Sequence, residues 1–442
     1  MANPIVDIFR VKELRERIAF TTMMLVVFRI GAFIPIPGVN VRELNAYFMS
    51  HAGGNPIIDY LDFFAGGAFS NFSVFMLGIM PYISMSIIMQ LLIIVFPKLK
   101  KISQEEGGKK RIQKYTRYGT VGVCLVQSFA VTQYAQSISR QVDNLLSINI
   151  LPFTIIAMLT VTTGTVFLMW IGEQITKRGI GNGISLLIFA GIVARLPQAI
   201  WELGRLVRDG DLNLVFVIVV LVMFVAVITL VVYEQRGQRK IPVNYAKRVV
   251  GRRMYGGAPN AFIPFKINPS GVIPVIFASS ILTFPIQIAS TIGGNVPWMA
   301  AISRALSPHG VTYNIIYVML IIFFAYFYTQ VTLNPIEISK QIRENGGSIP
   351  GIRSEKLEDY LTRILNRIVL PGSLYLAGIA VLPTIIQYFF GIPSSIAYLM
   401  GGTSLLIMVS VDLDTMSQIE ALLKMHHHEG LTKKGRIRGR NL

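Results

Sequence analysis

Long apolar runs alternate with short polar segments along the chain, and each run is about as long as a membrane-spanning helix. A bilayer core of roughly 30 Å requires about 20 apolar helical residues. The pattern therefore predicts an all-α polytopic membrane protein with ten transmembrane helices. The predicted spans are residues 18–36, 74–96, 119–138, 151–172, 184–203, 213–233, 271–291, 314–333, 368–389 and 397–416.

Residues 59–92 do not fit this alternation, because they combine a short amphipathic piece with a full span. The piece, 59–70, is rich in small residues and is too short to cross a bilayer. Backbone that stops partway through a membrane is buried in protein or lines a water-filled cavity, since lipid cannot satisfy its hydrogen bonds. We therefore expect a short half-helix over 59–70, beside a cavity.

The span that follows carries two isoleucines and two polar residues that can line a pore. Ile79 and Ile83 share one helix face, and Pro81 between them is expected to kink the helix because it removes a backbone hydrogen bond. Ser84 and Gln90 are polar, and such residues in a span usually face another helix or a pore. Two interpretations stay open: isoleucines that face lipid beside polar residues that join helices, or a lined pore.

Composition places the chain among integral membrane proteins. Its 442 residues are 52% hydrophobic and 14% charged, with a mean hydropathy of +0.56, whereas soluble domains carry about 25% charged residues. The single cysteine, Cys124, lies in an apolar span, which excludes a disulfide framework and a thiolate metal cluster. Residues 15–28 are similar to a signal peptide, but the apolar run continues without a small-residue cleavage site, so we interpret it as a retained first span.

Basic residues are concentrated on one predicted side of the membrane. With the N-terminus placed in the cytoplasm, 34 of the 41 Lys and Arg lie in cytoplasmic segments, as the positive-inside rule requires. These segments are 1–17, 97–118, 173–183, 234–270, 334–367 and 417–442. We therefore predict that both termini are cytoplasmic, the first within a short basic segment and the second in a basic tail.

The ten spans divide into two sets of five, 18–203 and 213–416. Because each set has an odd number of spans, the second begins on the opposite side of the membrane from the first. That is the geometry of an inverted repeat, in which binding sites and pores form between the halves. The halves show no convincing residue-level similarity, so the repeat is a hypothesis from topology.

Two predicted cytoplasmic loops, 234–270 and 334–367, stand out for size and charge. The first carries eight basic residues and one acid, and the second presents Arg353 in a turn rich in Gly and Pro. Such loops can simply orient the spans. Basic side chains at a loop tip, such as Arg252 and Arg253, are better suited to binding an anionic partner, RNA included.

The chain lacks the motifs of several enzyme and metal sites. It has no G-x-x-x-x-G-K-[ST] phosphate loop, and the glycine-rich run 178–185 lacks dinucleotide-site spacing. Histidines 426–428 lie in a basic tail without metal-site spacing, and Asp412 and Asp414 have no matching second intramembrane acid. We therefore predict no catalytic residue, no metal and no cofactor. Arg29 is a charge well inside a span, where it is functional or stabilises a loop or partner.

Eight motifs occur together and in order along the chain. The motifs are RIGAFIPIPG (29–38), FAGGAFSNFSVFMLGIMPYIS (64–84), TRYGT (116–120), GEQITKRGIGNGIS (172–185), VNYAKR (243–248), GVIPVIFASS (271–280), PGIR (350–353) and GGTSLLI (401–407). Together they resemble the SecY family, the central subunits of protein-conducting channels, and the resemblance covers nearly the whole chain.

The resemblance implies an hourglass pore between two five-span halves, narrowed by a ring of aliphatic side chains and closed by a plug. β-branched side chains are stiff, and an apolar constriction excludes ions by dewetting. The implied ring residues are Ile79, Ile83, Ile188, Ile276 and Ile407. The half-helix would be the plug, with Asp59, Phe63, Phe64, Gly66, Gly67 and Ser70.

The resemblance also implies a lateral gate, a polar seam between the second and third spans and the seventh and eighth. Weak hydrogen bonds across it would hold it shut until a signal sequence replaces them. The residues we assign to the gate are Ser84, Gln90, Gln127, Ser279 and Ser280.

In function, the resemblance implies a passive channel of the bacterial cytoplasmic membrane for unfolded secretory polypeptides, which releases apolar segments sideways into lipid. The implied partners are SecE, SecG, the SecA motor ATPase and the translating ribosome. The implied contacts for SecA or the ribosome are Arg239, Lys240, Lys247, Arg248, Arg252, Arg253 and Arg353.

A secondary transporter of a small solute is the alternative, but the chain shows no ladder of buried ion-coupling acids. An intramembrane enzyme would need a catalytic constellation that the sequence does not show.

Overall fold

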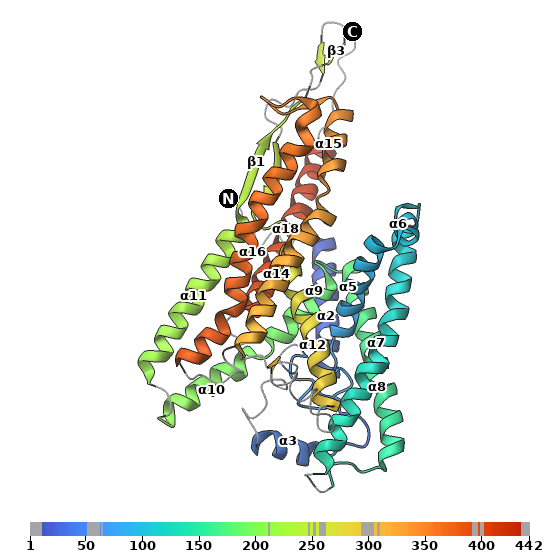
Figure 1. The fold of residues 1–442 in the computed structure, drawn as a ribbon, viewed down its shortest axis with the longest axis vertical. Coiled ribbons are helices and arrows are strands. Elements are labelled where there is room, and N and C mark those ends of the chain that lie inside the picture. Colours follow the sequence, from blue (N-terminus) through green and yellow to red (C-terminus); the bar gives the residue numbers. More distant parts are fainter. Residues whose placement is uncertain are drawn as a thin grey trace. The chain divides into compact units, whose positions relative to one another are not determined.

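The computed structural model describes residues 11–50, 62, 65–140, 142, 144–210, 213–245, 248–250, 253–255, 262–292, 305–306, 310–390, 397 and 402–434. They are mainly helical (Figure 1). The chain divides into two compact units. Unit 1 comprises Met1–Gly204, Gln287–Ala301 and Ile407–Leu442, and unit 2 comprises Arg205–Ile286 and Ile302–Leu406.

Helices occupy all ten predicted spans, and the fifth span consists of two helices. The helices in these spans are α2 (Lys12–Gly31), α5 (Met80–Val95), α7 (Gly108–Ser139), α8 (Ile150–Arg178), α9 (Gly183–Val193), α10 (Leu196–Arg208), α11 (Leu214–Arg236), α12 (Ile273–Ile292), α14 (Val311–Thr332), α16 (Leu357–Phe390) and α18 (Thr403–Lys434). Two shorter helices are α3 (Val41–Ser50) and α6 (Pro97–Gln104).

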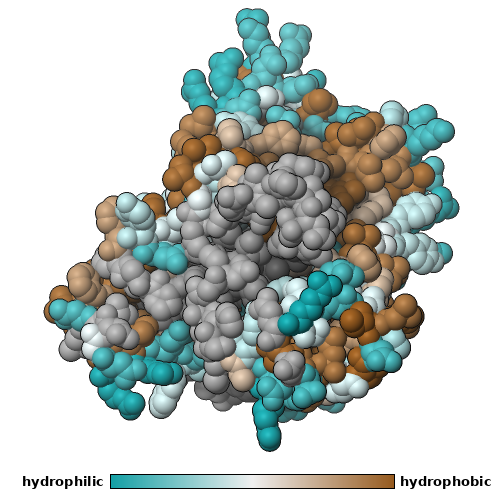
Figure 2. Space-filling view, turned by 60° about the horizontal axis from the view of Figure 1, so that its bottom comes forward, coloured by the Kyte–Doolittle hydropathy of each residue, from teal (hydrophilic) through white to brown (hydrophobic). Residues whose placement is uncertain are grey.

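Five described helical stretches are long and apolar enough by themselves to cross a membrane, and α5 with α6 would make a sixth despite a bend of 103°. Large apolar side chains are exposed along their flanks, for example Leu159 on α8 and Val222 on α11. Figure 2 shows such apolar surface beside groups of hydrophilic side chains. Exposed apolar flanks on span-length helices are typical of a multi-pass membrane protein.

In unit 1, α7 packs against both α5 and α8, and α8 also packs against α2 and α9. Glycine makes the approach of α8 to α9 possible. A Cβ atom on Gly183 would lie 1.9 Å from the carbonyl oxygen of Gly172, which is far inside van der Waals contact. Any larger residue at position 183 would therefore push the two helices apart.

The second predicted span begins later than its hydropathy indicates. Residues 65–79 form successive turns, and α5 starts at Met80 instead of position 74. Positive φ angles at Gly66 and Gly67, +65° and +89°, take this backbone out of the helical region. The half-helix expected over 59–70 is therefore wrong over 65–70. Of its remaining positions, Asp62 is helical and the rest lie outside the described residues.

Pro81 does not kink the helix, so that expectation is also wrong. It lies in the first turn of α5, where the missing N–H would have no partner within the helix in any case. Proline in this position starts a helix with its φ angle already set. The turn at Gly78, with φ +57°, leads directly into it.

In unit 2, α14 packs against α16, and the two loops expected over 234–270 and 334–367 fold together. The described strands form three antiparallel pairs. These pairs are β1 (Gln238–Pro242) with β5 (Phe262–Lys266), β2 (Asn244–Tyr245) with β6 (Gly347–Ser348), and β3 (Arg248–Val250) with β4 (Arg253–Tyr255). Because β2 comes from the first loop and β6 from the second, their pairing joins the loops.

The joined loops have an apolar core of their own, which we call the loop subdomain. It comprises β1, β2, β5, β6, α15 (Pro335–Glu344) and the start of α16, and it lies at one end of unit 2 (Figure 1). Phe265 of β5, Ile342 of α15 and Leu361 of α16 are among its buried residues. The basic loops therefore form a packed subdomain and are not only solvated connections between helices.

Candidate functional site

The five predicted ring isoleucines lie on four different helices or their ends. Ile79 precedes α5, Ile83 is in α5, Ile188 is in α9 and Ile407 is in α18, all within unit 1. These four are buried, with at most 7% of each residue exposed. Ile276 of α12, in unit 2, is half-buried. Burial contradicts the lipid-facing interpretation for Ile79 and Ile83, whereas the closed ring stays a prediction.

The predicted gate residues divide between the same two units. Ser84 and Gln90 are half-buried on α5, and Gln127 is buried on the adjacent α7. Ser279 and Ser280 are buried on α12. The structure thus places three of them on a pair of packed helices in unit 1, and the complete seam stays a prediction.

The buried serine Ser279 shows how a polar side chain can be buried in an apolar helix with its hydrogen bond satisfied. Its hydroxyl donates to the carbonyl oxygen of Ile276 at 2.9 Å, within the same helix. A hydroxyl satisfied in this way costs little to bury and can change partners when a polar backbone approaches. On α7, the Oε1 atom of buried Gln127 has no hydrogen-bond partner among the described residues.

The described part of the predicted plug, residue 62 with residues 65–70, makes charged and hydrogen-bonded contacts, and we call it the plug segment. The buried carboxylate of Asp62 accepts a hydrogen bond from the backbone N–H of Ser70 at 2.8 Å and another from the Ser70 hydroxyl. The same carboxylate forms an ion pair with Arg195, which lies between α9 and α10. Asp59, Phe63 and Phe64 of the predicted plug lie outside the described residues.

Arg29 stabilises this loop, one of the two roles considered for it. Its Nη1 atom donates to the carbonyl oxygen of Gly66 at 3.0 Å. Its guanidinium also lies over the ring of Phe33, 4.9 Å from the centroid, which favours a cation within an apolar span. Two arginines far apart in sequence therefore bind the plug segment.

Sequence reasoning did not identify Asp62 or Arg195 as a pair. Arg195 lies outside the segments predicted to be cytoplasmic, and Asp62 lies in the amphipathic piece 59–70, so neither position indicated the other as its partner. The sequence does show that each residue is a charged side chain within an apolar stretch, where burial of an unpaired charge has a high free-energy cost. That signal indicates that a partner exists without saying which one.

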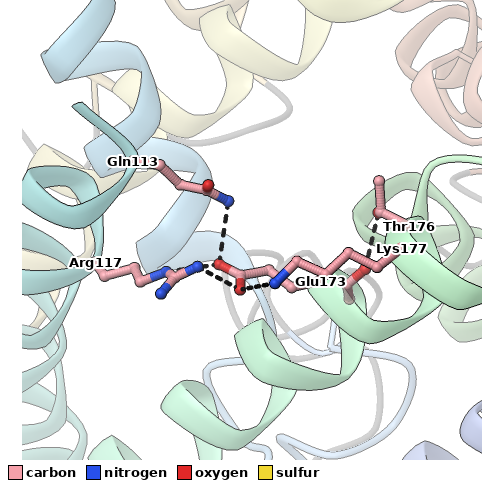
Figure 3. A network of polar contacts seen from close by, with 6 residues as sticks. Gln113, Arg117, Glu173, Thr176 and Lys177 are labelled. Atoms are coloured by element: carbon pink, nitrogen blue, oxygen red, sulfur yellow. Dashed lines mark hydrogen bonds and ion pairs between the residues drawn. The ribbon is translucent and has the colours of Figure 1, made fainter. Parts of the chain in front are cut away.

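A second polar network joins the ends of α7 and α8 (Figure 3). Arg117 donates to both carboxylate oxygens of Glu173, at 2.7 and 2.6 Å, and the amide of Gln113 donates to Oε1 at 3.3 Å. Lys177 lies 4.0 Å from the same carboxylate. The Thr176 hydroxyl donates to Gly172 and accepts from the backbone N–H of Gly183, each at 2.9 Å, which ties α8 to the start of α9.

This network clamps helices, because Glu173 ties α8 to α7 and Thr176 ties α8 to the start of α9. Its two main residues come from motifs that sequence analysis quoted separately, TRYGT and GEQITKRGIGNGIS. Among the described residues, no group of three or more His, Cys, Asp or Glu could hold a metal ion. The side chains of histidines 426–428 lie outside that part of the chain, although their backbone continues α18.

The predicted partner-binding residues lie in the two basic loops, 234–270 and 334–367, which we call the loop region of unit 2. Arg239 and Lys240 are exposed on β1, and Lys240 lies over the ring of Phe262, 4.8 Å from its centroid. Arg353 is exposed at the turn before the short helix η1 (Ser354–Lys356). Lys247 and Arg252 lie outside the described residues. The backbones of Arg248 and Arg253 belong to the β3–β4 pair.

The sequence model of the SecY family matches residues 73–416. The chain is 44% identical over 426 residues to protein translocase subunit SecY of Borreliella burgdorferi, with 96% of each chain covered. It is 43% identical over 431 residues to protein translocase subunit SecY of Escherichia coli K12, covering 97% of this chain and 96% of the relative.

Solved structures of low sequence identity share the fold. A protein-conducting channel matches with a TM-score of 0.64 at 21% identity, covering 92% of each chain. A SecY structure described by its plug domain, which stabilises the closed state of the translocation channel and maintains a membrane seal, matches with a TM-score of 0.63 at 22% identity, covering 92% of each chain. Sec61 in a canine ribosome-channel complex matches at 0.60 and 20% identity, with 92% of each chain covered.

The ten predicted spans, the motif order, the helical architecture and full-length relatives at more than 40% identity agree with one another. This chain belongs to the SecY family.

Proposed function

We propose that this protein is the central subunit of a channel that passes unfolded secretory polypeptides across the bacterial cytoplasmic membrane. The observation that carries the proposal is the identity to protein translocase subunits SecY over almost the whole chain. The solved protein-conducting channel with the same fold supports it. The proposed channel is passive, and its energy comes from partner proteins.

In the proposed resting state, the ring isoleucines seal the pore without binding what passes through it. Isoleucine offers a moving polypeptide no hydrogen bonds, and its branched side chain is stiff about χ1. An apolar constriction also loses its water and so blocks ions. Burial of Ile79, Ile83, Ile188 and Ile407 away from lipid supports this role.

The proposed lateral gate opens when a signal sequence replaces weak polar contacts with apolar burial. Hydrogen bonds between membrane helices contribute about 0.6 kcal/mol each, whereas each Leu, Ile, Phe or Val gains about 0.3–0.6 kcal/mol on insertion. About a dozen apolar residues therefore outweigh several such bonds. Polar chain gains nothing from lipid and continues through the pore.

The proposed partners bind the loop region of unit 2 from the cytoplasm. The solved Sec61 neighbour is part of a ribosome-channel complex, and the exposed cations Arg239, Lys240 and Arg353 suit an anionic surface such as ribosomal RNA. SecA is the proposed alternative motor at this face, and SecE and SecG are the proposed small subunits. The excess of Lys and Arg in the segments predicted to be cytoplasmic supports a cytoplasmic position for both termini.

A stalled-substrate crosslinking experiment tests the proposal. In a Cys124→Ser background, one cysteine replaces Ile79 or Ile188, and a secretory protein with its own cysteines is stalled midway. Disulfide crosslinks at these positions, and none at the exposed position Leu159→Cys on α8, are expected. Export without crosslinks at Ile79 or Ile188 would show that the polypeptide travels elsewhere.

A further inference from the structure

Backbone N–H groups in the turn between α8 and α9, residues 179–183, donate to side chains of two distant helices. The N–H of Ile180 donates to Thr21 Oγ1 on α2 at 3.1 Å, and the N–H of Gly181 donates to Gln418 Oε1 on α18 at 2.8 Å. Gln418 lies 237 positions after Gly181. The turn therefore joins α2 and α18 to α8 and α9, and all of these residues belong to unit 1.

The turn needs these side-chain acceptors because its backbone is buried. Ile180 and Gly181 are both buried, and a buried N–H without a partner costs more free energy than an ordinary hydrogen bond contributes. Gly181 has a φ angle of +82°, which favours glycine. A Cβ atom there would also lie 3.0 Å from Thr415 Oγ1, one turn before Gln418 on α18. The end of α18 therefore packs directly on Gly181.

The start of α9 is fixed to α8 by contacts that do not involve α18. The N–H of Gly183 donates to Thr176 Oγ1 at 2.9 Å, and a Cβ atom on Gly183 would lie only 1.9 Å from the carbonyl oxygen of Gly172. Asn182 caps α9, because its Oδ1 atom accepts the N–H of Ile184 at 3.1 Å. Loss of Gln418 would therefore release α18 from the turn and leave α9 in place on α8.

Both helices that meet at Gly181 carry a predicted ring isoleucine. Ile188 lies seven residues after Gly181 in α9, and Ile407 lies eleven residues before Gln418 in α18. At about 1.5 Å per helical residue, these isoleucines are roughly 10 and 16 Å from the contact along their own helices. Neither stretch contains proline, so each is expected to behave as a stiff helix. The position of α18 at Gly181 therefore determines where Ile407 lies relative to Ile188.

We propose that Gln418 is a positioning residue that fixes α18 against α9 through Gly181 and thereby sets the spacing of Ile407 and Ile188 in the closed channel. The inference rests on the proposed channel function and adds a determinant of its seal outside the ring. Gln418 lies in the segment predicted to be the cytoplasmic tail, so it acts through Ile407 and not on the translocating polypeptide. Thr21 binds the same turn from α2, a helix without a predicted ring residue, and provides a matched comparison.

The test compares two substitutions that each remove one acceptor from the same turn. Gln418→Met keeps the length of the side chain without its oxygen, and Thr21→Val keeps the shape of threonine without its hydroxyl. Both are expected to raise the rate of deuterium exchange in the peptide 178–185 on the order of tenfold, because a buried N–H loses its partner. Only Gln418→Met is expected to raise the resting ion conductance of reconstituted vesicles severalfold, since only this variant releases the helix of Ile407.

Two further variants of α18 serve as controls. Gln418→Glu keeps an oxygen acceptor at the same position, and it is expected to restore both exchange and conductance to the wild-type values. Ser417→Ala changes an exposed neighbour on the same helix and is expected to alter neither quantity. If Gln418→Met does not fold, Gln418→Leu also removes the acceptor, and the same leakage is expected.

Three results would overturn the proposal. Wild-type conductance in Gln418→Met despite faster exchange would limit the hydrogen bond to a structural role. Unchanged exchange in Gln418→Met would show that the bond does not protect the turn. Leakage in Thr21→Val or Gln418→Glu as large as in Gln418→Met would show that any change near the turn opens the pore.

Failure of this inference is distinguishable from failure of the proposed function. If stalled polypeptide crosslinks to Ile79→Cys in the otherwise wild-type channel but Gln418→Met does not leak, only the positioning role is wrong. If no polypeptide crosslinks to the ring positions, the channel proposal fails, whereas the exchange and conductance measurements still decide whether Gln418 positions α18.

Discussion

Arg117 on α7 donates to both carboxylate oxygens of Glu173 on α8, at 2.7 and 2.6 Å. The carboxylate is nearly buried, with 9% of the side chain exposed, whereas Arg117 is 39% exposed. The planar guanidinium binds both oxygens of the carboxylate at once, so the pair has a fixed relative orientation and is stronger than a single hydrogen bond. This pair fixes how two long helices of unit 1 meet at one end.

Loss of the arginine is expected to destabilise unit 1. Arg117→Met would leave Glu173 with Gln113 at 3.3 Å and Lys177 at 4.0 Å as its remaining partners. We expect a loss of about 2 kcal/mol in the free energy of unfolding, less than for a fully buried pair because Arg117 reaches water. Thermal unfolding of the purified protein in detergent measures it. The exposed pair Arg111–Glu105 is the control, and equal melting of Arg117→Met and Arg111→Gln would contradict the role.

A charge at the ring is expected to break the proposed seal. Ile188→Asp and Ile276→Asp would place a hydrated carboxylate where an apolar surface excludes water. We expect resting ion leakage in reconstituted vesicles, measured by single-channel conductance, and none for Ile188→Val. Conductance unchanged by either aspartate would count against an isoleucine seal.

Two glycine substitutions are expected to act in opposite directions. Gly183→Ala would place a Cβ atom 1.9 Å from the Gly172 carbonyl oxygen, so we expect a loss of about 1–3 kcal/mol. Gly122→Ala, within α7, meets nothing within 4 Å, and alanine favours a helix by about 0.8–1 kcal/mol over glycine. Melting temperatures should therefore fall for position 183 and hold or rise for position 122. A drop at position 122 as large as that at 183 would refute this packing argument.

Charge reversal on the loop region is expected to weaken binding to an anionic partner. Lys240→Glu together with Arg353→Glu should raise the Kd for purified ribosomes about tenfold, with a weaker dependence on salt. Co-sedimentation at several salt concentrations measures both quantities. Arg208→Glu, an exposed residue outside the loop region, is the control. Equal affinity of the double variant and the wild type would exclude these two cations from the contact.

Some features of the fold follow from sequence because they depend on local physics. Ten apolar runs became helices because a span must satisfy its own backbone hydrogen bonds. Hydropathy predicts that the second span starts at residue 74, six residues before α5 begins. The apolar run continues through the turns at 65–79, but the positive φ angles of the glycines there do not allow a helix. For the same reason, Pro81 indicated a kink in sequence but begins the helix in the structure.

Long-range pairings had no comparable signal. Asp62 with Arg195, Arg117 with Glu173, and β2 with β6 join segments between 56 and 133 positions apart in sequence. A charge in an apolar stretch indicates that it needs a partner, yet many cations could serve. Only packing decides which one comes within reach.

The sequence by itself determined the membrane class, the spans, the one-sided charge and the family resemblance, because these follow from hydrophobicity, helix period and motif order. The tertiary structure decided that four of the five predicted ring isoleucines are buried, that two basic loops share one core, and that two arginines contact the segment predicted to be the plug. Those facts depend on contacts between distant segments, whose free energy comes from close packing and from the exclusion of water around paired charges.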